Sequence, residues 1–529
     1  MTTATMANAS DSVGRTSHHP WLAVAAVLLG AFIAAFDVRL FALGLPDLRG
    51  QFGLSFDEGA WLTTVSAAPQ ILIAPAIAWL ATVFGLRRVL IWPSLLYVVT
   101  SLAIPFVRDY QLLVTLHFVR GLLLGAFVPA TIMIVLHNLP MRWWIIGLAA
   151  YSFRLSFTGN AGVSLVGFYV DRIGWQWLYW QDAVVALLMA LLTWLGTPRE
   201  DVNRKLMAQA DWSGMLLLGT GLALIYAGCD QGNRLDWFES GTVTGLIAAG
   251  GALVFAFLIN EAVVPEPWAS PTVLMSRNVA LVLLTMMTYM VTSLSNTMLV
   301  PNFLTAVAGL RPEQVGGLLL FYTALPLIVT VAAAVWLLRR IDARIVVLVG
   351  LASFAVAAWM GTRITHEWAP DNFIPMALVQ SVGQGLTFTG LLIFVLSNSN
   401  PARATAFVAY IQVMRLNIIE IAVTAMTTWL RVREQVHSHL IGLHVSAGDS
   451  DVAQALGRVT SRLIQHSADA ETALARATTI MVSFVRREAN VLSIIDGFEV
   501  AFWAAIVGLV LVSLMRAAPP GPLTPARAT

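Results

Sequence analysis

Two charged residues interrupt an apolar segment near the start of the chain. Residues 34–48 read AAFDVRLFALGLPDL, in which Asp37 and Arg39 lie within a hydrophobic run that begins at Trp21. A charged side chain inside a bilayer costs at least about 3 kcal/mol on insertion scales. Residues two apart on a helix point about 200° apart, so these two side chains face different neighbours. Asp37 therefore requires a partner or a hydrated cavity, whereas the longer Arg39 side chain can reach the membrane surface.

Later apolar segments contain further ionisable residues that are candidate partners for Asp37. The segment LHFVRGLLLG places His117 and Arg120 three residues apart on one helix face, and VMRLNIIEIAV contains Arg415 and Glu420. Ionisable groups within a membrane usually face the bundle interior and mark ion or substrate pathways. The residues that we assign to proton coupling are Asp37, His117, Arg415 and Glu420.

These residues receive different roles. Asp37 is the expected proton or cation site, because a carboxylate whose cavity opens and closes can exchange a proton. His117 is the expected second titrating group, since histidine changes charge near neutral pH. Arg415 is the expected partner of Asp37 or Glu420. The alternative is that fixed acid–arginine pairs only hold helices together. Asp182 begins a later apolar segment, and we interpret it as an ordinary hydrated residue near the membrane interface.

A second group of residues is a candidate substrate-binding set. Arginines within the apolar segments outnumber the deeper acids Asp37 and Glu420, and this excess favours an anionic substrate such as an aromatic or fatty acid. The tentative substrate-binding residues are Arg120, Arg154, Asn296, Gln380 and Gln384.

The composition identifies the elements that must position these residues. The chain has 529 residues, of which 58% are hydrophobic and 11% charged, against roughly 25% charged in a soluble domain. It is therefore expected to be an integral membrane protein. A net charge of +2 without a basic stripe gives no indication of nucleic-acid binding. The single cysteine, Cys229, has no partner for an intramolecular disulfide.

Apolar segments near the roughly 20 residues that span a bilayer recur along the whole sequence. We expect about fourteen transmembrane helices, because that many apolar segments reach this length. Their predicted ranges are 21–45, 59–81, 88–107, 111–136, 143–168, 177–197, 212–229, 241–260, 279–300, 314–338, 345–362, 373–396, 404–430 and 497–515. The distribution of arginine and lysine between the loops places both termini in the cytosol.

An internal similarity suggests how these helices are grouped. AWLATVFGLRRVLI (78–91) and VWLLRRIDARIVV (335–347) each place basic residues in a tight turn between two apolar segments. Two six-helix halves separated by two inserted helices give this spacing, and repeated bundles are a transporter architecture. The predicted units are a cytosolic tail 1–20, an N-terminal bundle 21–198, the inserted helices and linkers 199–277, a C-terminal bundle 278–516 and a cytosolic tail 517–529.

One long polar segment, 431–496, is placed on the periplasmic side by the helix count. Its apolar residues recur at helical spacing beside charged ones, which predicts two or three amphipathic helices. They form either a cap on the outer leaflet or bundle, or a docking surface for a periplasmic partner. His437, His439 and His444 in this segment are expected to be solvated, and no metal or cofactor is predicted.

The sequence resembles the EmrB/QacA-like, fourteen-helix drug:proton antiporters of the major facilitator superfamily. FDVRLFALGLPDLRGQFGLSFDEGAWLTTVSAAPQIL resembles the first-helix motif of that family, with Asp37 in the place of its membrane aspartate. DQGNRLDWFES (230–240), MSRNV (275–279) and RREANVLSIIDGF (486–498) resemble further motifs, and Arg415 in VMRLN matches an arginine of the thirteenth helix.

Three motifs depart from the superfamily pattern. Ala78, Thr82 and Val83 replace the glycine, aspartate and arginine in the turn after the second helix. The fourth-helix pattern Arg-x-x-Gln-Gly reads His117-Phe-Val-Arg120-Gly121, so its arginine is displaced by three positions. The Gly-Pro of the fifth-helix antiporter motif is Gly162-Val163.

The resemblance implies an inner-membrane exporter of small amphiphilic or aromatic compounds, driven by proton antiport with alternating access, of the kind that gives antibiotic resistance. It also implies a periplasmic adaptor and an outer-membrane channel as partners. A proton-driven symporter or a uniporter is an alternative that the altered antiporter motif favours. Another is a non-transporting sensor or scaffold that acts through 431–496. An enzyme is not expected, because no nucleophile or metal constellation is present.

Overall fold

A computed structural model describes residues 19–129, 139–140, 143–265, 267–269, 276–398, 404–445, 449–465 and 469–518. The expected cytosolic tails, 1–20 and 517–529, lie almost entirely outside these ranges, as does the end of the predicted segment 111–136. The described residues form helices and short connections without any strand. This confirms the expected all-helical fold class.

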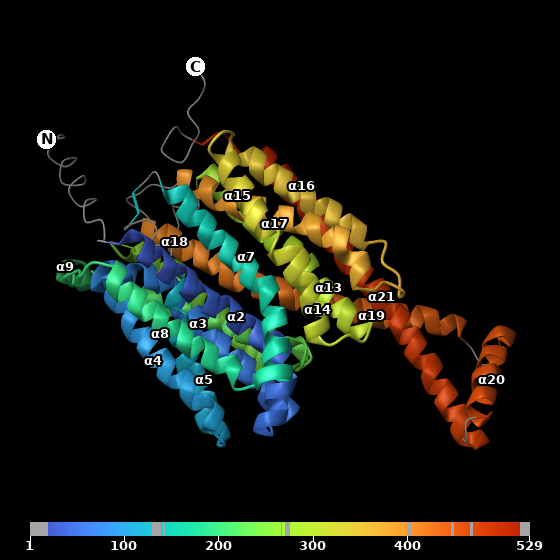
Figure 1. Ribbon diagram of the computed structural model, residues 1–529. Helices are drawn as coiled ribbons and strands as arrows, with labels where there is room; N and C mark the ends of the chain where they lie inside the picture. Colours follow the sequence, from blue (N-terminus) through green and yellow to red (C-terminus); the bar gives the residue numbers. More distant parts are fainter. Residues whose placement is uncertain are drawn as a thin grey trace.

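The first half of the bundle, blue to cyan in Figure 1, is built from six long helices. They are α2 (Pro20–Phe52), α3 (Phe56–Phe84), α4 (Leu86–Ala103), α5 (Tyr110–Leu124), α7 (Trp144–Phe168) and α8 (Trp177–Gly196). The short α9 (Arg204–Ala208) leads to two inserted helices, α10 (Trp212–Gly232) and α11 (Gly241–Val263). The inserted pair packs against itself, and α10 packs against α3.

The second half contains several helices that are interrupted by one turn of wider π-helix, a feature frequent at functional sites. One such turn, η6 (Ser295–Leu299), joins α12 to α13, and another, η10 (Met414–Ile418), joins α18 to α19. The helices are α12 (Arg277–Leu294), α13 (Val300–Ala306), α14 (Pro312–Leu319), α15 (Leu327–Leu338), α16 (Ala343–Gly361), α17 (Ile374–Ser397), α18 (Ala404–Val413), α19 (Ile419–His444), α20 (Ser450–Gln465) and α21 (Ala470–Ser513).

The helices agree closely with the predicted membrane segments. In the described part of the chain, 13 helices are long and apolar enough to cross a membrane, from Trp21–Phe41 to Ala470–Ser513. Helix α7 is not among them although it has 25 residues, because Arg154 and Asn160 make it more polar. Together with α7, the described part of the chain has a helix for each of the fourteen expected membrane segments.

Local sequence signals fix where these helices begin and end. Gly53 ends α2 with a φ of 68°, a backbone conformation that favours glycine. Ser55 and Glu58 then form a capping box, in which the Ser55 hydroxyl accepts from the Glu58 N–H at 3.2 Å and the Glu58 carboxylate accepts from the Ser55 N–H at 2.8 Å. The Asp109 carboxylate caps α5 in the same way, at 2.8 Å from the Leu112 N–H.

The two halves meet along α7, which packs against α14, α15 and α17 of the second half (Figure 1). Helix α18 makes a further contact with α3. Glycine permits the closest approach, since a Cβ on Gly316 of α14 would lie 2.6 Å from the Cα of Ser164 on α7. The interface between the halves is therefore formed mainly by the helix that carries Arg154.

Helices α19, α20 and α21 extend beyond the bundle at the end opposite α9 (Figure 1). We define the outer extension as residues 431–444, α20 and 470–496. His437 lies on α19 rather than in a loop, and its Nε2 lies 2.7 Å from Oδ2 of Asp496 on α21. Arg433 donates to the same carboxylate at 2.5 Å. Helix α21 continues without a break into the last predicted membrane segment, so the extension is joined rigidly to the bundle.

Candidate transport site

Asp37 lies in a buried cluster of three charged residues from three helices, which we call the acid–arginine triad. Arg120 of α5 lies between Asp37 of α2 and Asp182 of α8. Its Nη1 donates to Oδ1 of Asp37, and its Nη2 donates to Oδ2 of Asp182 at 2.6 Å. The side chains of Arg120 and Asp182 are 0% exposed. With all three residues ionised, the triad carries one net negative charge.

Polar and aromatic neighbours complete the triad. Tyr97 of α4 donates its hydroxyl to Oδ2 of Asp182 at 3.1 Å, and Nε of Arg120 donates to the Ser101 hydroxyl at 3.3 Å. The Arg120 guanidinium also lies over the Tyr97 ring, 4.8 Å from its centroid. Hydrogen bonds of this kind reduce the penalty for burying charge. The triad is thus linked to four helices of the first half.

The position of Arg120 depends on its neighbour Gly121. A Cβ on Gly121 would lie 2.1 Å from the Ser66 carbonyl oxygen of α3, so only glycine allows α5 to pack this closely. The close packing holds α5 at the depth where Arg120 reaches both carboxylates. The expected role of Arg120 in substrate binding is replaced by its pairing with Asp37.

His117 lies one turn before Arg120 and is fully buried. Its Nδ1 lies 2.8 Å from the Leu113 carbonyl oxygen, and its Nε2 lies 3.0 Å from the Tyr179 hydroxyl. Because a carbonyl only accepts, Nδ1 carries the proton and a neutral ring accepts from Tyr179 at Nε2. Both ring nitrogens are therefore occupied, and a titrating role for His117 stays a prediction.

Arg39 does not extend to the membrane surface, which corrects the sequence-based expectation. Its Nε donates to the Gly159 carbonyl oxygen of α7 at 2.7 Å, and its Nη1 donates to the Thr297 carbonyl oxygen of η6 at 3.2 Å. A Cβ on Gly162 would lie 3.0 Å from Cγ of Arg39, so this glycine leaves room for the side chain. Arg39 thus joins the first half to the second.

Arg415 is also placed differently from the prediction that it pairs with Asp37 or Glu420. Its Nε donates to Oε1 of Gln412 at 3.1 Å, and among the described residues it forms no ion pair. Glu420 has Asp230 of α10 as its electrostatic neighbour. The partner of Asp37 is Arg120, because α5 belongs to the same half of the bundle as α2, whereas Arg415 belongs to the second half.

Two of the predicted substrate-binding residues, Asn296 and Gln384, bind a residue of the other half. Asn160 of α7 donates to Oε1 of Gln384 at 2.9 Å and accepts from the Asn296 side chain. Gln380 donates to the Ser295 hydroxyl at 2.9 Å, and its Oε1 has no hydrogen-bond partner in the described structure. Asn296, Gln384 and Asn160 thus form one polar group, which contains side chains from both halves.

Arg154, also on α7, has fewer hydrogen-bond partners than the other buried arginines of the described structure. It is 5% exposed, and its Nε, Nη1 and Nη2 atoms have no hydrogen-bond partner in the described structure. The Tyr151 ring lies beside it, with 5.4 Å between Cζ and the ring centroid. The Arg415 guanidinium is near enough to repel it.

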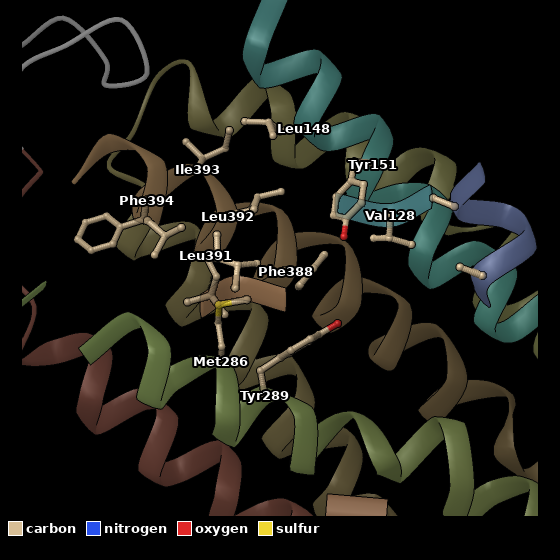
Figure 2. Close-up of a cluster of buried hydrophobic side chains, with 14 of the residues drawn as sticks. Val128, Leu148, Tyr151, Met286, Tyr289, Phe388, Leu391, Leu392, Ile393 and Phe394 are labelled. Carbon is tan, nitrogen blue, oxygen red and sulfur yellow. The ribbon is translucent and has the colours of Figure 1, made fainter. Parts of the chain in front are cut away.

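The Tyr151 ring beside Arg154 begins a row of aromatic side chains from three helices. Figure 2 shows Tyr151 of α7 and Tyr289 of α12 on either side of Phe388 of α17. The Tyr289 and Phe388 rings stack with centroids 5.7 Å apart, and the Tyr151 and Phe388 centroids are 6.4 Å apart. These rings provide a continuous apolar surface that begins at Arg154.

Two acids, Asp182 and Asp230, lie in contacts that differ from those expected from the sequence. Asp182 is fully buried rather than hydrated, and the signal for this was its position six residues inside α8 beside Tyr179. Asp230 of α10 accepts from the Thr64 hydroxyl of α3, so the inserted helices also carry a polar contact. Asp230 was considered only as part of a motif, and its position within an apolar helix was the missed signal.

Residues 27–418 match the family model described as the Major Facilitator Superfamily. The chain belongs to this superfamily. The predicted fold is thereby confirmed, and the chain is a membrane transporter rather than an enzyme. Two superfamily structures have the same overall fold. The proton:xylose symporter XylE has a TM-score of 0.54 at 12% identity over 90% of this chain and 94% of its own. The peptide transporter POT has a TM-score of 0.53 at 13% identity over 95% and 96%.

Curated relatives confirm the resemblance to the EmrB-like group. The chain is 24% identical to the multidrug export protein EmrB of Haemophilus influenzae over 80% of this chain and 82% of that protein. It is 21% identical to the fatty acid resistance protein FarB of Neisseria gonorrhoeae over 79% and 82%. It is 20% identical to the colistin resistance protein EmrB of Acinetobacter baumannii over 65% and 67%.

Proposed function

We propose that this protein exports small amphiphilic or aromatic compounds by proton antiport. The observation that carries the proposal is the buried acid–arginine triad formed by Asp37, Arg120 and Asp182. The names of its relatives, which include multidrug export and fatty acid resistance proteins, support the export of such compounds.

The charge of the triad suggests how it takes up a proton. One guanidinium faces two carboxylates, so the cluster carries one net negative charge when empty and is neutral with one proton. A neutral cluster is easier to enclose in a low-dielectric bundle. Asp37 is the expected proton acceptor because it is 7% exposed, whereas Asp182 is fully enclosed and also binds Tyr97.

The contacts between the halves suggest how proton uptake is linked to substrate movement. Asp37 and Arg39 lie two residues apart on α2, and Arg39 donates to backbone carbonyls on both halves. A change in the Asp37–Arg120 contact therefore acts on the helix whose Arg39 side chain binds both halves. Substrate then binds along the polar interface of Asn160, Asn296 and Gln384 and is released when the halves separate on the other side.

We propose an inner-membrane location with both termini in the cytosol. This arrangement follows from an even number of spans and from the basic loops. The outer extension is then periplasmic, and its exposed apolar side chains suit an adaptor protein that continues to an outer-membrane channel. These exposed side chains include Leu440, Leu443, Leu474 and Ile480.

Transport in liposomes tests the proposal. The full chain is reconstituted with a pH-sensitive dye inside, a proton gradient is imposed, and aromatic acids and lipophilic cations are added in turn. We expect substrate-evoked proton movement in the wild type and at least a tenfold loss in Asp37→Asn. Asp171→Asn is the matched control, because Asp171 is exposed near the end of the bundle.

Three outcomes of this experiment contradict the proposal. Proton movement that is unchanged in Asp37→Asn makes the triad a structural contact only. Transport in the same direction as the protons, seen when the pH gradient is reversed, indicates a symporter rather than an antiporter. No proton movement with any compound favours the scaffold alternative.

A further inference from the structure

We propose that Arg154 and Arg415 form a site for the carboxylate of an amphiphilic aromatic acid, between the two halves of the bundle. This inference rests on the proposed function, because it names the chemical class that the transport route accepts. It is carried by side-chain contacts that are independent of the acid–arginine triad.

The first observation is that Arg154 is buried without an acceptor. An arginine side chain stays protonated in proteins and has five N–H donors. In the described structure none of the three Arg154 nitrogen atoms has a hydrogen-bond partner, although the residue is 95% buried. Arg120, in the same half, contrasts with it because it has two carboxylates and a hydroxyl as acceptors. Arg154 therefore needs an anionic or polar acceptor that the described part of the bundle does not provide.

The second observation is that the opposite half adds another cation instead of an acid. Arg415 is 9% exposed, and its guanidinium repels that of Arg154. Neither residue forms an ion pair within the described ranges of the chain. Two buried guanidinium groups that repel each other are stabilised by a shared anion, because an arginine fork matches the two oxygens of a carboxylate.

The third observation is that the free polar groups near Arg415 are donors. Nε2 of Gln412 and Nδ2 of Asn417 are buried and without partners in the described structure. The Tyr151 hydroxyl beside Arg154 is also unpartnered. Donors that lack acceptors favour a ligand rich in acceptor oxygens over a lipophilic cation.

The fourth observation defines the rest of the ligand. The Tyr151 ring lies beside Arg154, and the Phe388 and Tyr289 rings continue from it, so that three helices from both halves contribute (Figure 2). An aromatic group of the ligand packs against these rings while its carboxylate faces the arginines. The site is complete only when both halves contribute, so binding there is sensitive to their separation.

Equilibrium binding to the full chain tests this site. The purified protein is placed in nanodiscs of phosphatidylcholine alone, and the probe is the fluorescent acid 1-pyrenebutyrate, with its carboxamide as a neutral control of the same shape. We expect the wild type to bind the acid at least tenfold more tightly than the carboxamide. Arg154→Gln and Arg415→Gln should remove that preference while leaving carboxamide affinity within about twofold. Arg363→Gln is the control, because Arg363 is exposed and lies over Trp359.

A conservative variant separates binding from folding. Arg154→Lys keeps the positive charge but lacks the planar fork, so we expect at least a threefold loss of acid affinity with some preference retained. Thermal unfolding and gel filtration identify any variant that misfolds. The acid preference of the variants that fold then tests the proposed site. Equal affinity of the wild type for acid and carboxamide, or full preference in both Arg154 variants, overturns the proposal.

A second binding measurement, with an anionic lipid present, identifies the source of the anion. The measurement is repeated with phosphatidylglycerol in the nanodiscs, whose phosphate offers the same acceptor chemistry. Unchanged acid affinity supports a transported acid. Displacement of the acid in proportion to phosphatidylglycerol overturns the substrate assignment in favour of a lipid site.

The result is distinguishable from a failure of proton antiport. Binding is measured without a gradient, and Asp37→Asn should retain the acid preference because Asp37 lies in the separate triad. Loss of proton movement with intact acid preference therefore contradicts only the proposed antiport. Proton-driven transport without any preference for the acid contradicts only the anion site.

Discussion

Nη2 of Arg120 lies 2.6 Å from Oδ2 of Asp182, in a position where neither side chain contacts solvent. The second guanidinium nitrogen binds Asp37, so a single arginine on α5 joins α2 and α8. This geometry makes the triad both a structural connection and a candidate proton site. Substitutions that change charge without changing shape separate these two roles.

Asp182→Asn is predicted to remove proton coupling while preserving the fold. The amide oxygen can still accept from Tyr97 and Arg120, but the remaining Asp37–Arg120 pair is already neutral and gains nothing by taking up a proton. We expect substrate-evoked proton movement in liposomes to fall at least tenfold. Tyr97→Phe is the control, because it removes one hydrogen bond, worth about 1 kcal/mol, and leaves the charges unchanged. Normal proton coupling in Asp182→Asn contradicts this assignment.

Arg120→Gln is predicted to destabilise the protein strongly. It leaves two buried carboxylates without their cation, and breaking a buried pair in this way costs roughly 3–5 kcal/mol. The midpoint of unfolding in detergent, with denaturant as the variable, measures the loss. Arg172→Gln is the matched control, because its pair with Glu313 is exposed and such pairs contribute at most about 1 kcal/mol.

The double variant Arg120→Gln with Asp37→Asn extends the same argument. Removing one carboxylate together with the cation restores the original net charge, so the double variant is expected to be more stable than Arg120→Gln alone. If it is instead less stable, each residue contributes mainly through packing and the electrostatic account of the triad is wrong.

The membrane segments could be predicted from the sequence because hydropathy and length alone determine them. The inserted segment 212–229 corresponds to Trp212–Gly232, and the segment 345–362 corresponds to Ala343–Gly361. Helix α7 could also be placed, although its polar residues lower its hydropathy, because its apolar run extends over 143–168. The last helix could not be delimited, because amphipathic and membrane-spanning turns are continuous in α21.

The partners of the charged residues could not be predicted in the same way. Asp37 and Arg120 are separated by 83 positions, and their contact depends on how α2 and α5 pack rather than on any local pattern. Arg39 binds backbone carbonyls, which have no signature in the sequence. Periodicity predicted that Asp37 and Arg39 face different neighbours, and this is confirmed. It gave no information about which helices those neighbours belong to.

Arg39→Met is predicted to weaken the contact between the two halves. Methionine retains much of the apolar side-chain volume but cannot donate to Gly159 of α7 or Thr297 of η6. We expect faster separation of the halves, measured as more rapid labelling of a cysteine placed at Ser164, which lies against Gly316. All variants also carry Cys229→Ser, which removes the native thiol. Arg311→Met serves as the control, because Arg311 is exposed. Identical labelling rates would show that these hydrogen bonds do not hold the interface together.

Serine substitutions in the outer extension are predicted to separate export across the envelope from transport across the inner membrane. Leu440, Leu443, Leu474 and Ile480 are exposed apolar residues on α19 and α21, outside the bundle. Replacing all four removes apolar docking surface but leaves the His437–Asp496 and Arg433–Asp496 contacts, so the extension should stay folded. We expect unchanged proton-driven transport in liposomes and at least a fivefold loss of efflux from intact cells. A matched quadruple substitution at the lipid-facing Leu187, Leu188, Leu191 and Leu195 of α8, each to alanine, controls for the loss of exposed leucine. Equal efflux from cells that carry the extension variant would argue against a periplasmic adaptor and favour a cap that only covers the bundle.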